Sequence, residues 1–428
     1  MRNNMKITAK QEQATPVLVP KLRFPEFRGA ALRSVLLGDV TEECRARNGH
    51  KHLVTSVMGV TKADGIVPME ARLIAADIAR YKLVQHDWFA YNPMRLNIGS
   101  IARWRGQNEI LVSPDYVVFK CLTDSESSIA PGFLDHFRQT KTWEEFVTEG
   151  GDGSVRVRIY YKDIARVALV LPPFPEQQKI ADCLSSVDEL IAAQARKMDA
   201  LKAHKKGLMQ QLFPREGETQ PRLRFPEFQN AGEWDFKPFE EFVTKSFYGT
   251  SSSTSPTGKY PVLRMGNMVD GGLDFTNMVY LDLDAESFES FRLENGDILL
   301  NRTNSPALVG KISLFQLNSE CMTASYIVSY RLNKKRIDPS FCNSMLNTPL
   351  YQSRIRSFAK PSVSQVNINP TTFKKDLMVS VPSLPEQQRI AECLTSIDDL
   401  IAVQTQKLEA LRTHKKGLLL QIFPSPEE

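Results

Sequence analysis

Residues 174–214 read FPEQQKIADCLSSVDELIAAQARKMDALKAHKKGLMQQLFP, and this stretch decides the fold because the chain repeats it. Residues 385–424 read PEQQRIAECLTSIDDLIAVQTQKLEALRTHKKGLLLQIFP. Aligned over the 43 residues that end at these final prolines, the two copies share 26 identities. A second repeat lies upstream, where KLRFPEF at 21–27 returns as RLRFPEF at 222–228. The chain is therefore predicted to be a tandem duplication, in which a globular segment and a long helix alternate twice.

Each copy predicts one long α-helix, over 175–213 and 385–423. Proline stands in the first turn, where its missing N–H costs nothing, and glutamate follows it at the positive end of the helix dipole. The basic HKKG sequence lies near the other end, where positive charge is favoured. A helix of this length rises roughly 57 Å. We expect it to act as a spacer between globular segments.

Apolar residues along both helices are spaced alternately by four and three, and seven of the nine positions are apolar in each copy. The positions are Leu184, Val187, Ile191, Gln194, Met198, Leu201, Lys205, Leu208 and Leu212, and then Leu394, Ile397, Ile401, Gln404, Leu408, Leu411, Lys415, Leu418 and Ile422. This pattern predicts an antiparallel coiled coil related by a pseudo-twofold axis. Its register is expected to pair Gln194 with Lys415 and Lys205 with Gln404. Alternatively, both lysines extend to the surface and specify no register.

The composition is that of an ordinary globular protein with a mild positive charge. The 428 residues are 42% hydrophobic and carry a formal net charge of +5, which permits nucleic-acid binding without requiring it. The six cysteines include no CxxC pair, so we expect reduced cysteines acting as small apolar residues. No apolar run reaches membrane-spanning length and the N-terminus lacks a signal-peptide core, so a cytoplasmic protein without a membrane partner is expected.

The two globular segments both predict α+β folds. Residues 1–20 are polar and aperiodic and are expected to form a disordered tail, followed by one domain over 21–171 and another over 221–381. Strands are predicted at 116–122, 155–161 and 167–172 in the first domain, and at 261–268, 297–302, 310–315 and 324–332 in the second. Helices are predicted near 131–146 and 339–358. Asp87 and Asp297 occupy corresponding positions, whereas Trp234 has no counterpart in the first domain.

The chain lacks the sequence patterns of a catalytic site. There is no GxxxxGK[ST] phosphate loop and no GxSxG nucleophile turn. His50 and His52 have no zinc ligands at suitable spacing, and Pro114–Asp115 lacks the acidic-x-Lys partner of a nuclease. YNPM at 91–94 only loosely matches the NPP[FY] loop of adenine methyltransferases. We therefore expect a binding protein with no catalytic residues, no metal and no cofactor of its own.

Polar and basic side chains on the predicted loops are of the types that contact DNA bases and phosphates. In the first domain these are Arg95, Asn97, Arg103, Arg105, Arg156 and Arg158. In the second domain they are Arg264, Asn267, Arg302, Asn304, Lys360, Ser362, Ser364, Gln365 and Asn367. In the first domain, Arg156 and Arg158 stand at roughly the sequence position that residues 364–367 have in the second domain. Any single residue of this kind is usually a solvated surface residue, and their grouping on corresponding loops supports the prediction.

The sequences LPPFPEQQKIADCLSSVDELI and VPSLPEQQRIAECLTSIDDLI, the two RFPEF segments and the paired HKKGL segments resemble the specificity subunit of type I restriction-modification enzymes. The resemblance implies two target-recognition domains, each reading half of a bipartite double-stranded DNA site and held apart by antiparallel helices. It also implies partners: two modification subunits that use S-adenosylmethionine to methylate adenine N6, and restriction subunits that use ATP and Mg²⁺. None of that chemistry is expected in this chain.

Two further readings of the sequence remain open. One is a non-catalytic scaffold whose globular domains bind proteins, which would show no steep salt dependence in DNA-binding assays. The other is an autonomous nuclease or methyltransferase, which would require the missing cofactor loop. Under the DNA-binding reading, half-sites on one DNA face lie ~34 Å apart and the helices set their spacing. Removing one heptad from both helices is then predicted to shorten the unspecified spacer and leave each half-site unchanged.

Overall fold

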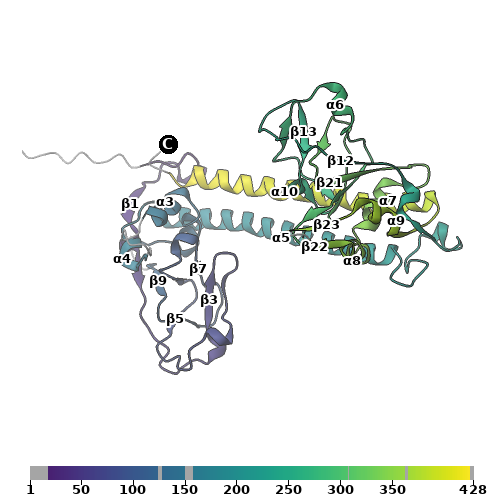
Figure 1. Ribbon diagram of the computed structural model, residues 1–428. Helices are drawn as coiled ribbons and strands as arrows, with labels where there is room; N and C mark the ends of the chain where they lie inside the picture. The colour runs from purple at the N-terminus through teal and green to yellow at the C-terminus, as the bar shows by residue number, and fades with distance from the viewer. Residues whose placement is uncertain (1–17, 124–127, 150–157, 307, 362–364, 425–428) are drawn as a thin grey trace, which may run out of the picture. The chain divides into compact units, whose positions relative to one another are not determined.

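The computed structural model describes residues 18–123, 128–149, 158–306, 308–361 and 365–424. The chain divides into two compact units, unit 1 with residues 1–194 and 407–428, and unit 2 with residues 195–406. Each unit contains part of both long helices, α5 (Phe174–Leu212) and α10 (Leu384–Ile422) (Figure 1). Both units combine helices with mainly antiparallel sheets, which confirms the predicted α+β class and the repeat.

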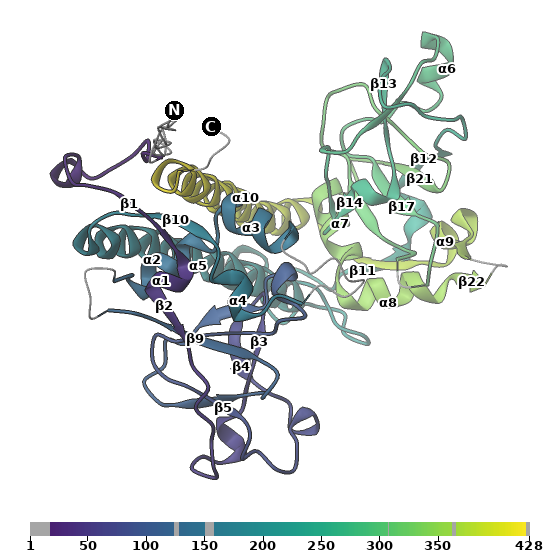
Figure 2. The ribbon, with the colours of Figure 1, turned by 90° about the vertical axis from the view of Figure 1, so that its left-hand side faces the viewer.

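Unit 1 is built on a four-stranded antiparallel sheet in the order β2-β9-β6-β7. Figure 2 labels two of its strands, β2 and β9. Its strands are β2 (Thr41–Glu43), β9 (Val117–Cys121), β6 (Phe89–Tyr91) and β7 (Ile101–Arg103). Three strand pairs accompany it: β1 (Arg33–Leu36) with β10 (Ala168–Leu171), β3 (Met58–Thr61) with β4 (Gly65–Pro68), and β5 (Lys82–Val84) with β8 (Ile110–Val112). The short helices are α1 (Leu37–Val40), α2 (Pro131–Phe137), α3 (Lys141–Glu149) and α4 (Tyr161–Ile164).

Unit 2 repeats this plan with the strand order β12-β21-β17-β19. The strands are β12 (Val243–Tyr248), β21 (Ile327–Leu332), β17 (Ile298–Asn301) and β19 (Ile312–Leu314). The remaining strands are β11 (Asp235–Pro238) with β24 (Met378–Val381), β13 (Tyr260–Leu263) with β16 (Val279–Leu281) and β20 (Met322–Thr323), β14 (Met268–Val269) with β15 (Gly272–Leu273), and β18 (Thr303–Asn304) with β23 (Val366–Ile368) and β22 (Ala359–Pro361). The short helices are α6 (Ala285–Glu289), α7 (Pro339–Leu346), α8 (Pro349–Ser357) and α9 (Pro370–Asp376).

The start of each long helix is fixed by the repeated PEQQ and RFPEF sequences. In unit 1, the buried Glu176 carboxylate pairs with Arg23, and the buried Gln177 amide accepts a hydrogen bond from Ala130 N at 2.8 Å, just before α2. In unit 2, Glu386 pairs with Arg224 in the same way, and the Gln387 side chain binds the equivalent position before α7. Glutamate and glutamine recur in both copies because each satisfies buried polar groups of its own unit.

The end of each long helix packs into a hydrophobic core. In unit 1, Phe423 lies against Phe133 and Phe137 of α2, with ring centroids 4.9 and 5.9 Å apart. In unit 2, Phe213 lies against Trp234 and Phe341 at 6.3 and 5.4 Å. The repeated Phe-Pro that closes each copy is therefore a core residue followed by a helix-ending proline.

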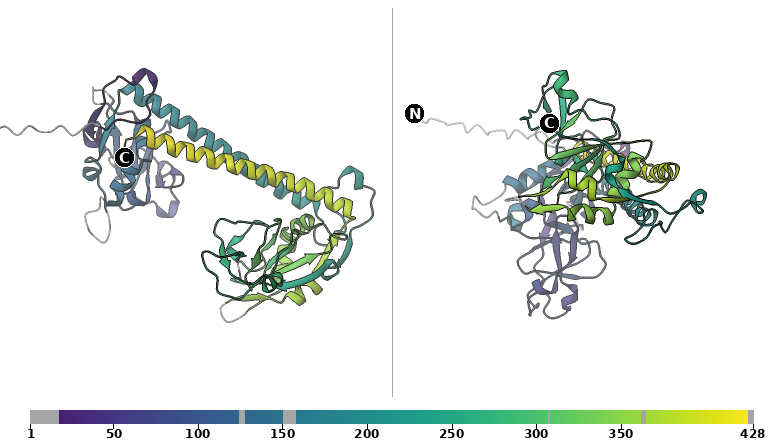
Figure 3. Two further views of the ribbon diagram at one scale, coloured as in Figure 1. Left: turned by 90° about the horizontal axis from the view of Figure 1, so that it is seen from above. Right: turned by 45° about the vertical axis from the view of Figure 1, so that its right-hand side comes forward.

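Within each unit the parts of α5 and α10 run side by side and antiparallel (Figure 3). The predicted direction is confirmed, but the predicted register is wrong. Lys415 Nζ lies 2.6 Å from Asp188 in unit 1, and Lys205 Nζ lies 2.6 Å from Asp398 in unit 2. Both partners precede the expected glutamines, Gln194 and Gln404, by about one heptad. The lysines leave the apolar seam because a carboxylate beside it pairs with the ammonium group better than an amide inside it.

Most predicted strands and helices are present. The segment 116–122 forms β9, 167–172 forms β10, and the segments near 131–146 and 339–358 form two helices each. The strand predicted at 155–161 is wrong where it is described, because residues 158–160 are irregular and Tyr161 begins α4. The tail predicted at 1–20 lies outside the described residues up to 17. The domain limits 21–171 and 221–381 stay predictions.

All six cysteines are free, as expected for reduced thiols. Burial raises the pKa of Cys44 to about 11 and that of Cys321 to about 12, which makes these thiols poor nucleophiles. Among the described helices, none combines enough length with enough apolar character to cross a bilayer.

Candidate nucleic-acid interface

The same backbone contact forms the candidate interface in both units. In unit 1, Ile159 N donates to Pro93 O at 3.1 Å, which joins the loop after β6 to the segment before α4. In unit 2, Ile368 N donates to Arg302 O at 2.8 Å, which joins the residue after β17 to β23, just before α9. β6 and β17 hold the same place in the two sheets. The predicted DNA-contacting loops therefore correspond in space within their units, and not only in sequence.

In unit 1, the contact gathers three of the predicted residues on one surface. Arg95 and Asn97 are exposed on the loop that follows β6, and exposed Arg158 precedes Ile159. The loop is held in shape by Asn92, whose carbonyl accepts from Arg95 N at 3.0 Å, and by Gly99 at φ +89°, which closes the turn back into β7. Arg156 lies outside the described residues.

Arg103 and Arg105 lie at the other end of the β6–β7 hairpin, because Arg103 pairs with Phe89 and not with the loop. Both arginines face Asp135, whose carboxylate is 3% exposed. Arg105 Nη2 lies 2.8 Å from this carboxylate and Arg103 Nε 3.5 Å from it. Burial acts to raise the pKa of Asp135, but Arg138 and these two arginines hold it below its usual value. The structure thus separates Arg103 and Arg105 from the surface formed by Arg95, Asn97 and Arg158.

In unit 2, a small sheet brings several predicted residues together. β23 lies between β18 and β22, so that Asn367 is opposite Thr303 on one side and Lys360 on the other. The Thr303 hydroxyl donates to the Asn367 side chain. Gln365 is exposed just before this strand, while Ser362 and Ser364 lie outside the described residues. The sheet presents a polar, basic edge directly beside Arg302.

Two of the predicted asparagines are used by the protein's own backbone. Asn267 is 4% exposed; its carbonyl oxygen accepts from Arg264 N and its amide donates to Asp274 O, both at 2.8 Å. Asn304 is 8% exposed, and its carbonyl oxygen accepts from Ser305 N at 2.8 Å. These amides shape their loops, and their contact with DNA stays a prediction. Arg264 itself donates to Asn277 O at 3.0 Å.

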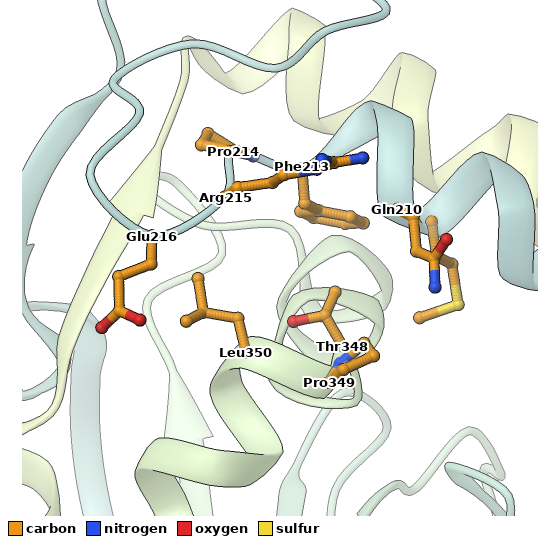
Figure 4. A pocket seen from close by; sticks show the side chains of 9 residues that line it. Gln210, Phe213, Pro214, Arg215, Glu216, Thr348, Pro349 and Leu350 are labelled. Carbon is orange, nitrogen blue, oxygen red and sulfur yellow. The ribbon is translucent and has the colours of Figure 1, made fainter.

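Cavities lie among the described residues of unit 2. One of about 290 Å³ lies where α5 ends and α8 begins. Figure 4 shows Thr348, just before α8, and Leu350 of α8 on the opposite side of this pocket from Phe213 and Pro214. None of the predicted DNA contacts lines it. Another, of about 410 Å³, is lined by Arg264 and Tyr326 among others. Across the described part of the chain, no three His, Cys, Asp or Glu side chains are grouped as metal ligands.

Comparison with known proteins gives a consistent family. Residues 232–413 match the family described as the type I restriction modification DNA specificity domain. A putative type I restriction enzyme MjaX specificity subunit from Methanocaldococcus jannaschii is 28% identical over 45% of this chain and 45% of its own length. The MjaVIII specificity subunit of the same organism is 24% identical over 66% of this chain and 67% of its own. The chain thus aligns with under half of the first relative and about two thirds of the second.

Solved structures share the fold. The type I restriction-modification S subunit from M. genitalium superposes with a TM-score of 0.60 at 13% identity, covering 95% of this chain and all of that one. A chain from a structure on complex assembly and conformational transition of the type I R-M system has a TM-score of 0.52 at 16% identity, covering 91% of this chain and 96% of that one. At these identities the likeness concerns the fold alone.

Proposed function

The chain belongs to the specificity subunits of type I restriction-modification enzymes, and from that premise we propose that it binds double-stranded DNA and selects the sequence to be modified. Units 1 and 2 each read one half of a bipartite target. The observation that carries the proposal is the repeated backbone contact, Ile159 N to Pro93 O and Ile368 N to Arg302 O, which places basic and amide side chains at the same position on two matching sheets.

The chemistry of these surfaces fits DNA. In unit 1 the exposed residues are Arg95, Asn97 and Arg158. In unit 2 they are Lys360 and Gln365, with half-buried Asn367 beside them. Both sets combine cations for phosphates with amides for base edges. The surrounding loops are held by backbone hydrogen bonds, so little ordering is needed when DNA binds. The domain limits 21–171 and 221–381 are part of this proposal as the two target-recognition domains.

The reactions belong to partner subunits in this proposal. Two modification subunits bring S-adenosylmethionine and methylate adenine N6, and restriction subunits bring ATP and Mg²⁺. The duplicated helices, with equivalent exposed leucines at 190 and 400, offer each unit's part of the helix pair to one copy of such a partner. This chain supplies sequence selection and no catalytic group.

Salt-dependent DNA binding tests the proposal. The full chain, co-expressed with its modification subunits, is titrated with duplex DNA at several salt concentrations. Binding through Z phosphates lowers log K against log salt with a slope of about −0.9Z, so we expect a steep fall. The variant R95A/R158A should reduce this slope by about 1 to 2. The variant K202A, which replaces an exposed lysine of α5, serves as the control and should leave the slope unchanged.

Sequencing of methylated bases in DNA modified by the same complex supplies the second readout. A two-part motif with adenine methylation is expected. An affinity that does not change with salt, together with unmethylated DNA, would identify the chain as a protein-binding scaffold and overturn the proposal.

A further inference from the structure

Arg302 differs from other arginines of unit 2, whose guanidinium groups already bond to the protein. Its backbone is fixed on both sides, because its N–H donates to Tyr326 O at 3.0 Å and its carbonyl accepts from Ile368 N at 2.8 Å. Its guanidinium has no hydrogen bond or ion pair with any described residue, and its Nε atom is buried without a hydrogen-bond acceptor. A buried donor without an acceptor is costly, so it needs a physical explanation.

An aromatic ring holds the Arg302 side chain in place. The guanidinium carbon lies 5.1 Å from the ring centroid of Tyr248, at the end of β12. Stacking of this kind holds the guanidinium against the ring and leaves its nitrogen edge available. Tyr248 is itself 49% exposed, so the stacked pair lies at the protein surface. The result is an arginine with a fixed backbone, a supported side chain and unused donors.

Neighbouring arginines in unit 2 lack this combination. Arg264 already donates to a carbonyl, and Arg331 is neutralised by Asp297, with Nη2 3.0 Å from its carboxylate. Arg336 also stacks on a ring, Phe242, but its Nη2 pairs with Glu241 at 3.0 Å. Arg302 instead adjoins the polar edge formed by Thr303 and its partner strand β23. Its position therefore suits a ligand that supplies two acceptors.

We infer that Arg302 reads a guanine in the half-site bound by unit 2 and that Tyr248 positions its guanidinium; this inference rests on the proposed function. Guanine presents O6 and N7 together in the major groove, and these match two parallel donors of one guanidinium. Adenine offers a donor in place of O6, and pyrimidines lack the paired acceptors. Arg302 is then a specificity-determining residue, and Tyr248 is a positioning residue.

Methylation-motif sequencing of variants tests the inference. R302Q, which keeps a similar length, should make one G·C position of one half-site degenerate, with about 10- to 100-fold lower discrimination against the wrong base. R302K should not restore discrimination, since an ammonium is a point charge without paired donors. Y248A should weaken discrimination at the same position by a smaller factor, and Y248F, which retains the ring, should restore it. A purely structural role for Tyr248 would not act on a single base pair.

R336A is the matched control, since it removes a ring-stacked arginine from the same unit, and the motif should stay unchanged. If R302Q abolishes methylation, competition binding of the complex with duplexes changed at each position provides the same readout. An unmethylated wild-type sample would contradict the proposed function. A wild-type motif that R302Q leaves intact, or one without a specified G·C pair in the affected half, would overturn the inference alone.

Discussion

Glu386 and Arg224 form a two-pronged ion pair at the start of α10, with Nε and Nη2 of the arginine each 2.7 Å from a carboxylate oxygen. The glutamate side chain is 1% exposed and the arginine 8%. Trp234 Nε1 also donates to this carboxylate at 3.3 Å. The RFPEF segment at 224–228 is thereby fixed to α10, with the two partners 162 residues apart in the sequence. Unit 1 repeats the arrangement with Arg23 and Glu176.

Replacing this glutamate should destabilise unit 2. E386Q leaves the buried Arg224 charge without its counter-charge, and losing one partner of a buried pair costs about 3–5 kcal/mol. Urea unfolding followed by tryptophan fluorescence measures the change, because Trp234 contacts the same carboxylate. E392Q is the matched control on the same helix. Glu392 is 71% exposed, so its variant should change the free energy of unfolding by less than ~0.5 kcal/mol; equal effects of the two variants would contradict the prediction.

The observed helix register predicts a specific energetic coupling. Lys205 Nζ lies 2.6 and 2.7 Å from the two carboxylate oxygens of Asp398. Because Asp398 is 51% exposed, water screens the pair and we expect a coupling of about 0.5 kcal/mol. A double-mutant cycle with K205M and D398N, measured by urea unfolding at low and high salt, determines it. The cycle of K205M with Q404L is the comparison; a larger coupling there would restore the register predicted from sequence.

The heptad pattern could predict the helices but not their register. A shift by one heptad places apolar positions opposite apolar positions again, so only the polar interruptions distinguish the alternatives. Lys205 and Lys415 were expected to settle this by meeting glutamines inside the seam. Both instead reach aspartates beside it, since a lysine stem spans that distance while its carbons stay packed.

The sequence also predicts only part of the candidate interface, because residue type does not show how the fold uses a side chain. Residue type indicates what a side chain offers, as with Arg302 and Asn367. The fold brings these two together, because Ile368 N donates to Arg302 O and Thr303 pairs with Asn367. Residue type does not indicate whether the backbone already uses that side chain, as it does at Asn267. Tyr248 gave no signal, because its contact with Arg302 exists only once distant strands have paired.

Two glycines should respond to alanine with opposite signs. A Cβ on Gly249, next to Tyr248, would lie 1.9 Å from the backbone oxygen of Thr323, so G249A forces the strand to move and should cost about 1–3 kcal/mol or more. Gly207 lies inside α5 with open space around its Cβ position, so G207A should stabilise by about 0.5–1 kcal/mol through helix propensity. Thermal unfolding of both variants is the measurement, and a stabilised G249A would contradict the packing seen around Tyr248.

The buried imidazole of His136 should make unit 1 sensitive to acid. Its Nε2 lies 3.1 Å from Ser185 Oγ and its Nδ1 3.9 Å from Asp188, with the side chain 1% exposed. Burial, followed by the nearby Lys415 ammonium, lowers the pKa of His136 to about 4. The other charged groups that act on it are Asp188, Asp135 and Arg105.

The sign of the pH dependence follows from proton binding. An unfolded histidine has a pKa of about 6.5, so between that pH and about 4 the unfolded chain binds the proton and the folded chain does not. Stability should therefore fall as the pH drops through this window, by up to ~1.4 kcal/mol per pH unit, and this contribution should level off below pH 4. H136Q should remove most of this slope in urea unfolding measured from pH 7 to pH 4. H414Q, which replaces an exposed histidine of the same unit, should keep it; equal slopes for wild type and H136Q would show that other groups govern the acid response.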